Sequence, residues 1–491
     1  MKVGLLYSSK DFKWKDTENK IFDDRFYDLE MEHVLDVMSG GDEEIFEICR
    51  QVIDKSLQTK SEILYRQEIL KDCIKNSEAV INIYKICVDT VAKRNNAWYG
   101  LSMTHSSTIF SNAIELLKIY MEALVDIRKV LERESFSSEG MRRFSDLIIR
   151  ELSDDYLKEL KSLKEDIDDR DSIIISAEFG DFLQGISYAK CRKEHGFSRL
   201  QWLILPSYTV SERDVSGTKD IEDRVDRAVN KVADSTSRAA ENLERFVNQL
   251  RKEISFYVGA VNLFNEMNEL NLPICFPLPL DENRRVWEDL CDVSLALMTK
   301  KKVIGNYIES NDKKLYLITG ANQGGKTTFL RSVGQCQLMA QSGLFVCAKK
   351  CEIPINKTVY THFKREEDEK MSSGKLDEEL ERMSNIIDEI KTGSLLLSNE
   401  SFSSTNDLEG SEIFEQITDG LIDSGVEVFS VTHLVNYADL YADKNTTMCL
   451  RAQRSEDGKR TFRLVNARPL KTAYGEDIYN KIFTGGLKNE N

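Results

Sequence analysis

One stretch of the sequence, from Leu315 to Arg331, constrains the fold more than any other. Its apolar start, Leu315–Thr319, ends abruptly in a glycine-rich turn, and apolar residues at helical spacing follow. The turn fits the pattern G-x-x-x-x-G-K-[ST], in which glycines let backbone N–H groups close around phosphate oxygens and the helix start adds its positive dipole end. The stretch therefore predicts a phosphate-binding loop between a strand and a helix.

The candidate nucleotide-binding residues in this loop are Gly320, Asn322, Gly324, Gly325, Lys326, Thr327 and Thr328. We expect Lys326 to reach the β and γ phosphates of ATP, because a lysine that follows the last glycine projects toward them. We expect Thr327 to hold Mg²⁺ through its hydroxyl oxygen, with water and nucleotide oxygens as the other ligands. ATP and Mg²⁺ are therefore the predicted cofactors.

The composition limits the classes of function. A chain of 491 residues has room for two to four domains. Its net charge of −16 disfavours a protein that coats nucleic acid nonspecifically, although it leaves room for a local basic patch. The apolar runs are too short for a membrane span, and the first residues become polar too soon for a signal peptide. These features predict a cytoplasmic protein without a membrane segment.

The first part of the chain, residues 1–280, is predicted to be a mostly helical domain, because apolar residues recur there at spacings of three and four. A change of period at about 172–210 predicts a small β insert. From Thr218 to Val258 the sequence lacks Gly and Pro, which predicts one helix about 60 Å long that acts as a lever or strut. A proline-rich segment, Leu272–Leu280, marks the predicted domain boundary.

The second part, residues 281–491, alternates strand and helix patterns, which predicts a doubly wound α/β nucleotide-binding domain. Its second nucleotide strand, Ser394–Leu397, leads into Asn399 and Glu400. NTPases of this type usually carry Asp-Glu there, where Asp holds the water shell of Mg²⁺ and Glu acts as the base for the attacking water. An amide at 399 can still bind a metal-bound water, but it lacks charge, so slower hydrolysis is expected. Glu400 remains the candidate catalytic base.

Three further stretches become candidates beside the loop. Ser373 and Gly374 precede a helical pattern, so they can contact a second phosphate, most naturally one bound to a partner subunit. The polar loop Ser403–Gly410 follows the catalytic strand directly and could contact nucleotide across an interface. His433 ends a strand. Two roles are open for it: a sensor of the γ-phosphate, or a capping or surface histidine.

The order of these motifs resembles the MutS mismatch-repair ATPases. The resembling segments are Thr-Gly-x-Asn-x-Gly-Gly-Lys-Thr-Thr, Leu338–Val346, Ser-Gly-Lys, Asn-Glu, Ser-Thr-Asn-Asp, Thr-His, Arg463-Leu464 and Ala473-Tyr474-Gly475. This similarity covers most of residues 290–480. The helical half is a looser match, through Arg66-Gln67 and through the long helix ahead of Phe276.

The resemblance implies a homodimeric ABC-type ATPase with composite sites, in which Lys326, Thr327, Glu400 and His433 come from one subunit and Ser373 and Gly374 from the other. It also implies that DNA is the partner and that ATP switches a clamp on it. Core-like sequence begins by about Phe26, so we expect a short paralogue without the N-terminal mismatch-recognition and connector domains. Two alternatives stay open: a nucleotide-gated scaffold for a protein or ribonucleoprotein partner, and a small-molecule kinase.

Overall fold

The computed structural model describes residues 2–14, 20–97, 106–153, 174–179, 185–191, 215–365, 374–455 and 460–469. The chain divides into two compact units. Unit 1 consists of Met1–Gly4, Glu78–Ser137 and Met141–Ile254. Unit 2 consists of Leu5–Ser77, Ser138–Gly140 and Ser255–Asn491. None of the helices in the described ranges combines the length and the apolar character that crossing a bilayer requires.

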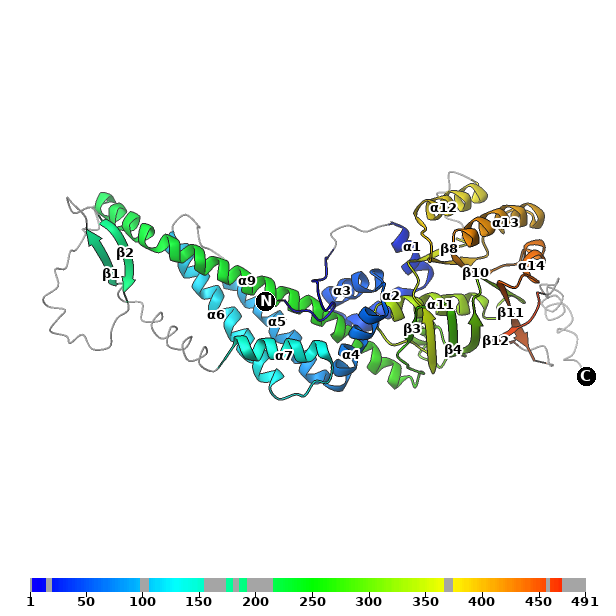
Figure 1. Ribbon diagram of the computed structural model, residues 1–491, viewed down its shortest axis with the longest axis horizontal. Helices are drawn as coiled ribbons and strands as arrows, with labels where there is room; N and C mark the ends of the chain where they lie inside the picture. Colours follow the sequence, from blue (N-terminus) through cyan, green and yellow to red (C-terminus); the bar gives the residue numbers. More distant parts are fainter. Residues whose placement is uncertain are drawn as a thin grey trace, which may run out of the picture. The chain divides into compact units, whose positions relative to one another are not determined.

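Unit 1 is built mainly from helices. Its elements are α5 (Ser77–Ala97), α6 (Ser106–Leu131), α7 (Glu139–Glu151), β1 (Ile174–Phe179), β2 (Gly185–Cys191) and the N-terminal part of α9 (Val215–Glu269) (Figure 1). The helices bury their apolar stripes against one another, with Ile83, Leu124 and Leu250 fully buried. The strands β1 and β2 form an antiparallel pair, which lies within the predicted β insert. The further strands predicted at 202–205 and 207–210 fall outside the described residues.

Helix α9 is longer than the predicted 218–258 segment, because it continues through Gly259 to Glu269. A glycine inside a helix costs only about 1 kcal/mol relative to alanine, so it weakens a helix without ending it. Here the missing side chain also has a packing role, since a Cβ atom on Gly259 would lie 2.7 Å from the Sγ atom of Cys49. The helix ends where Asn271 adopts a left-handed conformation (φ 52°), shortly before Pro273.

Unit 2 combines N-terminal helices with two sheets. Its helices are α1 (Lys20–Asp28), α2 (Met31–Ser39), α3 (Glu43–Asp54), α4 (Lys60–Lys75), the C-terminal part of α9, α10 (Val293–Thr299), α11 (Lys326–Gln341), α12 (Lys375–Glu389), α13 (Asp407–Asp423) and α14 (Val435–Tyr441). Asp42 and Thr59 cap α3 and α4 by accepting hydrogen bonds from the first turn of each helix, as N-cap residues do.

The predicted boundary near residue 280 does not separate the two compact units, because residues 5–77 pack with the C-terminal part. The guanidinium of the fully buried Arg66 donates a hydrogen bond to the carbonyl oxygen of Ser342 (2.9 Å) at the end of α11, and another to the carbonyl oxygen of Leu6 (2.9 Å). Gln335 of α11 donates to the carbonyl oxygen of Leu29 at 3.0 Å. The two contacts with α11 join residues that are 276 and 306 positions apart, which periodicity cannot reveal.

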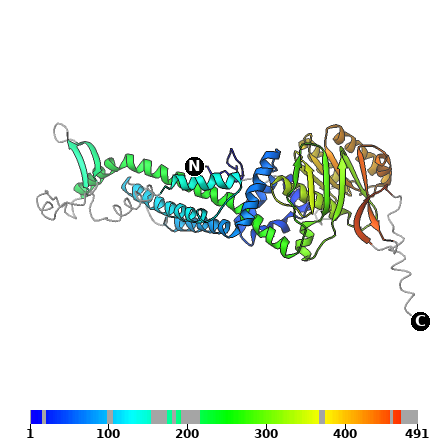
Figure 2. The same cartoon turned by 60° about the horizontal axis from the view of Figure 1, so that its bottom comes forward.

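The larger sheet has the strand order β12-β11-β6-β10-β9-β8. Its strands are β6 (Leu315–Thr319), β8 (Val359–Phe363), β9 (Leu395–Asn399), β10 (Glu427–Val431), β11 (Thr447–Arg454) and β12 (Arg460–Asn466). All neighbours pair in parallel except β12, which is antiparallel to β11. Figure 2 shows the strands of the C-terminal part side by side. The predicted mixed α/β architecture of this part is therefore confirmed.

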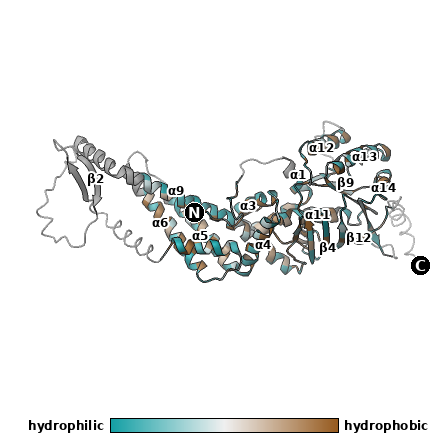
Figure 3. Ribbon diagram, viewed as in Figure 1, coloured by the Kyte–Doolittle hydropathy of each residue, from teal (hydrophilic) through white to brown (hydrophobic). Residues whose placement is uncertain are grey.

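Helices cover both faces of this sheet. They are needed on both because successive side chains of a strand point to opposite faces, and here both sets are apolar. On one face, Leu315 and Leu317 of β6 pack with residues of α12, α13 and α14 in one apolar core. On the other face, Tyr316 of β6 stacks on Phe429 of β10, with ring centroids 3.9 Å apart, and α11 contacts β8, β9 and β10. In Figure 3, α12 and α13 carry hydrophilic as well as hydrophobic residues, as helices with one buried face should.

The second sheet was not predicted. It has the order β3-β7-β4-β5 and is formed by β3 (Leu278–Leu280), β7 (Lys350–Pro354), β4 (Arg284–Leu290) and β5 (Asn306–Asn311). Its strands β4 and β5 carry many charged and polar residues, which hides their strand character from a search for apolar runs. Arg285 of β4 is fully buried and pairs with Glu427 of β10, so one ion pair links this sheet to the larger one.

Candidate functional site

Three neighbouring strands of the larger sheet bring the candidate residues together. Strand β10 lies between β6 and β9, and all three run parallel. Their carboxyl ends therefore meet at one edge of the sheet, which is where open α/β sheets bind ligands. The loop 320–325 follows β6, Glu400 follows β9, and His433 follows β10 after one residue.

The loop after β6 needs its glycines. Gly320 and Gly325 have φ values of 115° and 88°, in the left-handed region that residues with a side chain rarely adopt. Gly324 is required for a different reason, since a Cβ atom there would lie 2.8 Å from the Cβ atom of Ala452 on β11. Gly325 is the N-cap residue of α11, so the loop leads directly into the helix start. Asn322 is exposed on this loop, and Thr328 lies half-buried in the first turn of α11.

The side chain of Lys326 folds back over the loop. Its Nζ atom donates hydrogen bonds to the carbonyl oxygens of Gly320 and Ala321, each at 3.0 Å. Burial lowers the pKa of Lys326, and the negative charge of Glu400 partly offsets this effect. The ammonium group of Lys326 is thus held against the carbonyl groups of the loop. A phosphate oxygen bound in the loop would contact it there.

Thr327 and Asn399 are in direct contact although 72 residues separate them. The hydroxyl of Thr327 donates a hydrogen bond to the Oδ1 atom of Asn399 at 3.0 Å. Both groups present oxygen atoms, and oxygen is the ligand that Mg²⁺ prefers. The donor set at this point of the site therefore suits Mg²⁺ held through its water shell.

Glu400 lies beside His433 at the end of the neighbouring strand. Its Oε1 atom is 3.2 Å from the Nε2 atom of His433, which is an ion-pair distance. This contact is the main reason why the pKa of Glu400 lies below its ordinary value, and the charges of Lys326 and Lys364 act in the same direction. Glu400 also has a left-handed backbone (φ 55°), so the extended conformation of β9 ends at Asn399. The carboxylate is therefore ionised and able to accept a proton.

The two remaining candidates precede α12. Gly374 is the exposed N-cap residue of α12, and its carbonyl oxygen accepts the first hydrogen bond of the helix from Glu378. Ser373 lies outside the described residues. The structure thus brings together Lys326, Thr327, Asn399, Glu400 and His433, whereas Gly374 begins a helix that packs against β8.

The pairing of β11 with β12 was not predicted from the sequence. These strands contact the phosphate-binding loop. Arg460 donates a hydrogen bond to the Oε1 atom of Gln323 at 2.6 Å. The backbone of Phe462, which has a left-handed conformation (φ 58°), lies about 3.5 Å from the position that a Cβ atom of Gly325 would take. The single earlier signal was the resemblance at Arg463-Leu464.

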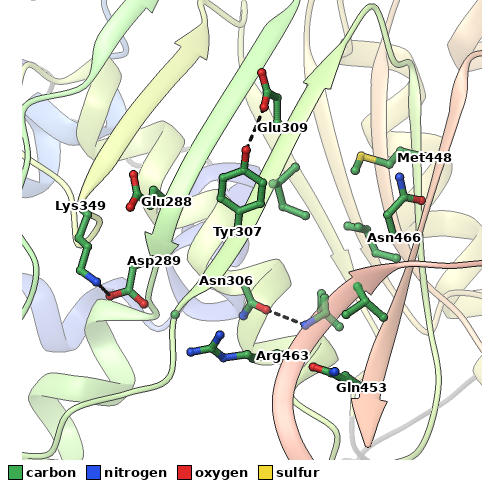
Figure 4. Close-up of a pocket in the computed structure, with 15 residues that line it drawn as sticks. Glu288, Asp289, Asn306, Tyr307, Glu309, Lys349, Met448, Gln453, Arg463 and Asn466 are labelled. Atoms are coloured by element: carbon green, nitrogen blue, oxygen red, sulfur yellow. Dashed lines mark hydrogen bonds and ion pairs between the residues drawn. The ribbon is translucent and has the colours of Figure 1, made fainter.

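A pocket of about 570 Å³ opens beside this hairpin. It lies between β4 and β5 of the smaller sheet and β11 and β12 of the larger one, as Figure 4 shows. The amide of Asn306 accepts a hydrogen bond from the backbone N–H of Leu464 at 2.7 Å and so joins the two walls. Tyr307 is 58% exposed at the pocket, and Arg463 lines it one residue from Phe462.

Two protein families match this chain. Residues 58–270 match the MutS2 N-terminal domain, and residues 316–482 match MutS domain V. The second match contains the whole loop and the strand ends described above. The first contains α4, α5, α6 and α7 and ends one residue after α9.

Curated relatives agree with these matches. Endonuclease MutS2 of Thermus thermophilus is 35% identical over 121 residues, which are 25% of this chain and 16% of that protein. DNA mismatch repair protein MutS of Thermotoga maritima is 32% identical over 140 residues, 28% of this chain and 18% of that protein. Endonuclease MutS2 of Lacticaseibacillus casei is 31% identical over 185 residues, 37% and 23% respectively. The chain thus matches less than a quarter of the length of these relatives, and the two domain matches place it in the MutS family.

Proposed function

We propose that this chain is an ATP-dependent DNA-binding protein of the MutS class, which acts as a homodimer and uses ATP binding and hydrolysis to switch its grip on DNA. The single observation that carries the proposal is the contact of Thr327 with Asn399 beside Lys326 and Glu400, at the carboxyl edge of the sheet. The similarity to an endonuclease MutS2 and to a DNA mismatch repair protein MutS supports the DNA-repair ATPase class.

The residues divide the work of hydrolysis as follows. Lys326 exchanges the carbonyl oxygens of Gly320 and Ala321 for the β and γ phosphate oxygens, where its charge stabilises the transition state. Thr327 and Asn399 would hold Mg²⁺, and the bound ion would neutralise phosphate charge. Glu400 accepts the proton of the attacking water. His433 lies where it can sense the γ-phosphate and limits the rotation of the Glu400 carboxylate.

The pocket beside β12 is the natural place for the nucleoside part of ATP. Phe462 borders the loop at Gly325, and the next residue of the same strand, Arg463, lines the pocket. The loop residues themselves do not line the pocket, so β12 is the connection between the two on which this placement depends. The exposed ring of Tyr307 offers a flat surface there for an aromatic base.

Helix α9 supports a lever role. Its 55 residues correspond to a length of about 80 Å, and it contributes to both compact units. In this proposal, Ser373 and Gly374 of a second copy complete each nucleotide site, so ATP draws two subunits together and α9 transmits the change toward DNA. A cytoplasmic location remains a prediction that follows from this role.

The proposal is tested by nucleotide and DNA binding with wild type and two variants. Lys326→Ala should abolish tight ATP binding, and Glu400→Gln should bind ATP but accumulate the ATP-bound state. Gel filtration should show an ATP-dependent dimer, and duplex, mismatched, branched and single-stranded DNA should be retained differently with and without ATP at two salt concentrations. If ATP changes neither the dimer equilibrium nor DNA retention, the proposal is wrong.

Asn399 favours a second candidate, a nucleotide-gated scaffold that binds a protein or ribonucleoprotein partner and scarcely hydrolyses ATP. An uncharged amide binds the Mg²⁺ water shell less strongly than a carboxylate would. The net charge of −16 also favours this candidate, because a negatively charged protein is repelled by nucleic acid. Partner capture that is insensitive to salt, without measurable DNA affinity, would select this candidate over the first.

A further inference from the structure

A buried polar cluster lies directly beneath the candidate base. It consists of His362 on β8, Glu379 on α12, and Ser398, Ser401 and Ser404 around the end of β9. His362 and Ser398 are fully buried, and Glu379 is 6% exposed. The chemistry proposed above uses none of these side chains, although Ser401 directly follows Glu400.

The imidazole of His362 fixes the direction of the hydrogen bonds in this cluster. Its Nε2 atom lies 3.0 Å from the carbonyl oxygen of Glu379, and its Nδ1 atom lies 2.6 Å from the hydroxyl oxygen of Ser401. Burial lowers the pKa of His362 to about 4, so the ring is neutral and carries one N–H. A carbonyl oxygen can only accept, so Nε2 carries this proton, and Nδ1 accepts the hydroxyl proton of Ser401.

Glu379 holds the loop after Glu400 with both of its carboxylate oxygens. Oε2 accepts the backbone N–H of Phe402 at 2.6 Å, and Oε1 accepts the hydroxyl of Ser404 at 2.7 Å. One residue of α12 thus provides its backbone carbonyl to His362 and its side chain to the loop. A buried carboxylate is expensive to leave unpaired, so these hydrogen bonds strongly select one position of the loop relative to α12.

The held loop is strained, so it needs such a clamp. Glu400 and Phe402 both have left-handed backbones, with φ values of 55° and 57°. A left-handed backbone is unfavourable for a residue with a side chain, and it persists only where its surroundings over-determine it. The loop also has little free space on the side of α13, because a Cβ atom on Gly410 would lie 2.5 Å from the carbonyl oxygen of Phe402. Without the Glu379 hydrogen bonds, relaxation of this backbone would move the Glu400 carboxylate.

We propose that Glu379 is a positioning residue for Glu400, and that it makes α12 and the Glu400 carboxylate move as one unit. The inference depends on the proposed function, since it assigns Glu400 as the base. It adds a coupling that none of the motifs contains: the helix that begins at Gly374 controls the base of its own subunit. If a partner's nucleotide contacts that helix start, its arrival at one site sets the base at the other.

The test compares steady-state hydrolysis with ATP affinity. Glu379→Ala should lower kcat by about tenfold to a hundredfold, because a displacement of about 1 Å costs on this order in rate. The Kd for ATP should stay within about twofold, since the binding loop is untouched. Glu379→Gln should restore most of kcat, because its amide oxygen still accepts from Phe402 and its NH₂ group can donate to Ser404. Glu381→Ala, an exposed residue two positions further along α12, is the matched control.

A double variant separates positioning from general damage. If Glu379 acts through Glu400, Glu379→Ala should cost nothing further in the Glu400→Gln background, because residues that act as a unit are not additive. The inference would be overturned if the losses in kcat of the two single variants multiply in the double variant. A kcat of Glu379→Ala within twofold of wild type would also overturn it. Equal hydrolysis by wild type and Glu400→Gln would instead refute the assignment of the base. Should Glu379→Ala fail to fold, Ser401→Ala and Ser404→Ala replace it, and unchanged kcat in both overturns the inference.

Discussion

An alanine at position 324 would place its Cβ atom 2.8 Å from the Cβ atom of Ala452 and 2.9 Å from the carbonyl oxygen of Ala321. Optimal contacts between carbon atoms lie at about 3.5–4.0 Å, so the overlap is on the order of 1 Å. Overpacking of this kind costs about 1–3 kcal/mol. The loop must move away from β11 to relieve it, and it then loses the shape that closes around phosphate.

We therefore expect Gly324→Ala to weaken ATP binding by about tenfold to a hundredfold, the equivalent of about 1.4–2.8 kcal/mol. The assay is equilibrium titration with a fluorescent ATP analogue, together with urea unfolding to measure the folding free energy. Gly420→Ala on α13 is the matched control, because a Cβ atom there has no neighbour within 4 Å. It should leave ATP affinity unchanged and stabilise the fold by about 0.5–1 kcal/mol.

A second substitution tests the cause. Ala452→Gly removes the Cβ atom with which the new side chain of Gly324→Ala would clash. The double variant should therefore recover part of the lost ATP affinity. The recovery should be incomplete, because the contact with the carbonyl oxygen of Ala321 remains. Wild-type affinity in Gly324→Ala alone, or no recovery in the double variant, would refute the steric explanation.

Three other outcomes are expected. Asn399→Asp should raise Mg²⁺-dependent hydrolysis, because a carboxylate binds the metal's water shell more strongly; a lower rate in a turnover assay would show a specific role for the amide. Contact with His433 lowers the pKa of Glu400, so its basic form persists as pH falls toward that lowered pKa; His433→Ala should move the acid limb of the pH–rate profile to higher pH. Glu427→Leu leaves the buried Arg285 unpaired and should destabilise the fold by about 3–5 kcal/mol in urea unfolding, with strong non-additivity against Arg285→Met.

Much of the fold was predictable because the signals were local. The helices of residues 26–134 and the strands β6, β9 and β10 follow from apolar spacing within windows of a few residues. The candidate residues of the loop could likewise be named from a pattern eight residues long. Their meeting with Asn399 and Glu400 followed from one rule, that the carboxyl ends of parallel strands share an edge.

The remaining features could not be predicted, because they depend on contacts between distant segments. The smaller sheet pairs β4 with β7 across more than 60 residues, and both strands are rich in charge. Residues 5–77 join the C-terminal part through single buried side chains such as Arg66. The role of Glu379 could not be predicted, because α12 contains many acidic residues and the sequence does not show which of them is buried.

The sequence by itself determined where the glycine loop, its strand and its helix begin and end, because backbone conformation there is set by neighbouring residues. Only the tertiary structure decided what holds that site in place: Ala452 against Gly324, Arg460 on Gln323 and Glu379 beneath Glu400. The reason is physical. A side chain's hydrogen-bond partner depends on where the chain returns in space, and chain returns of 20 to 140 residues leave no periodic trace in the sequence.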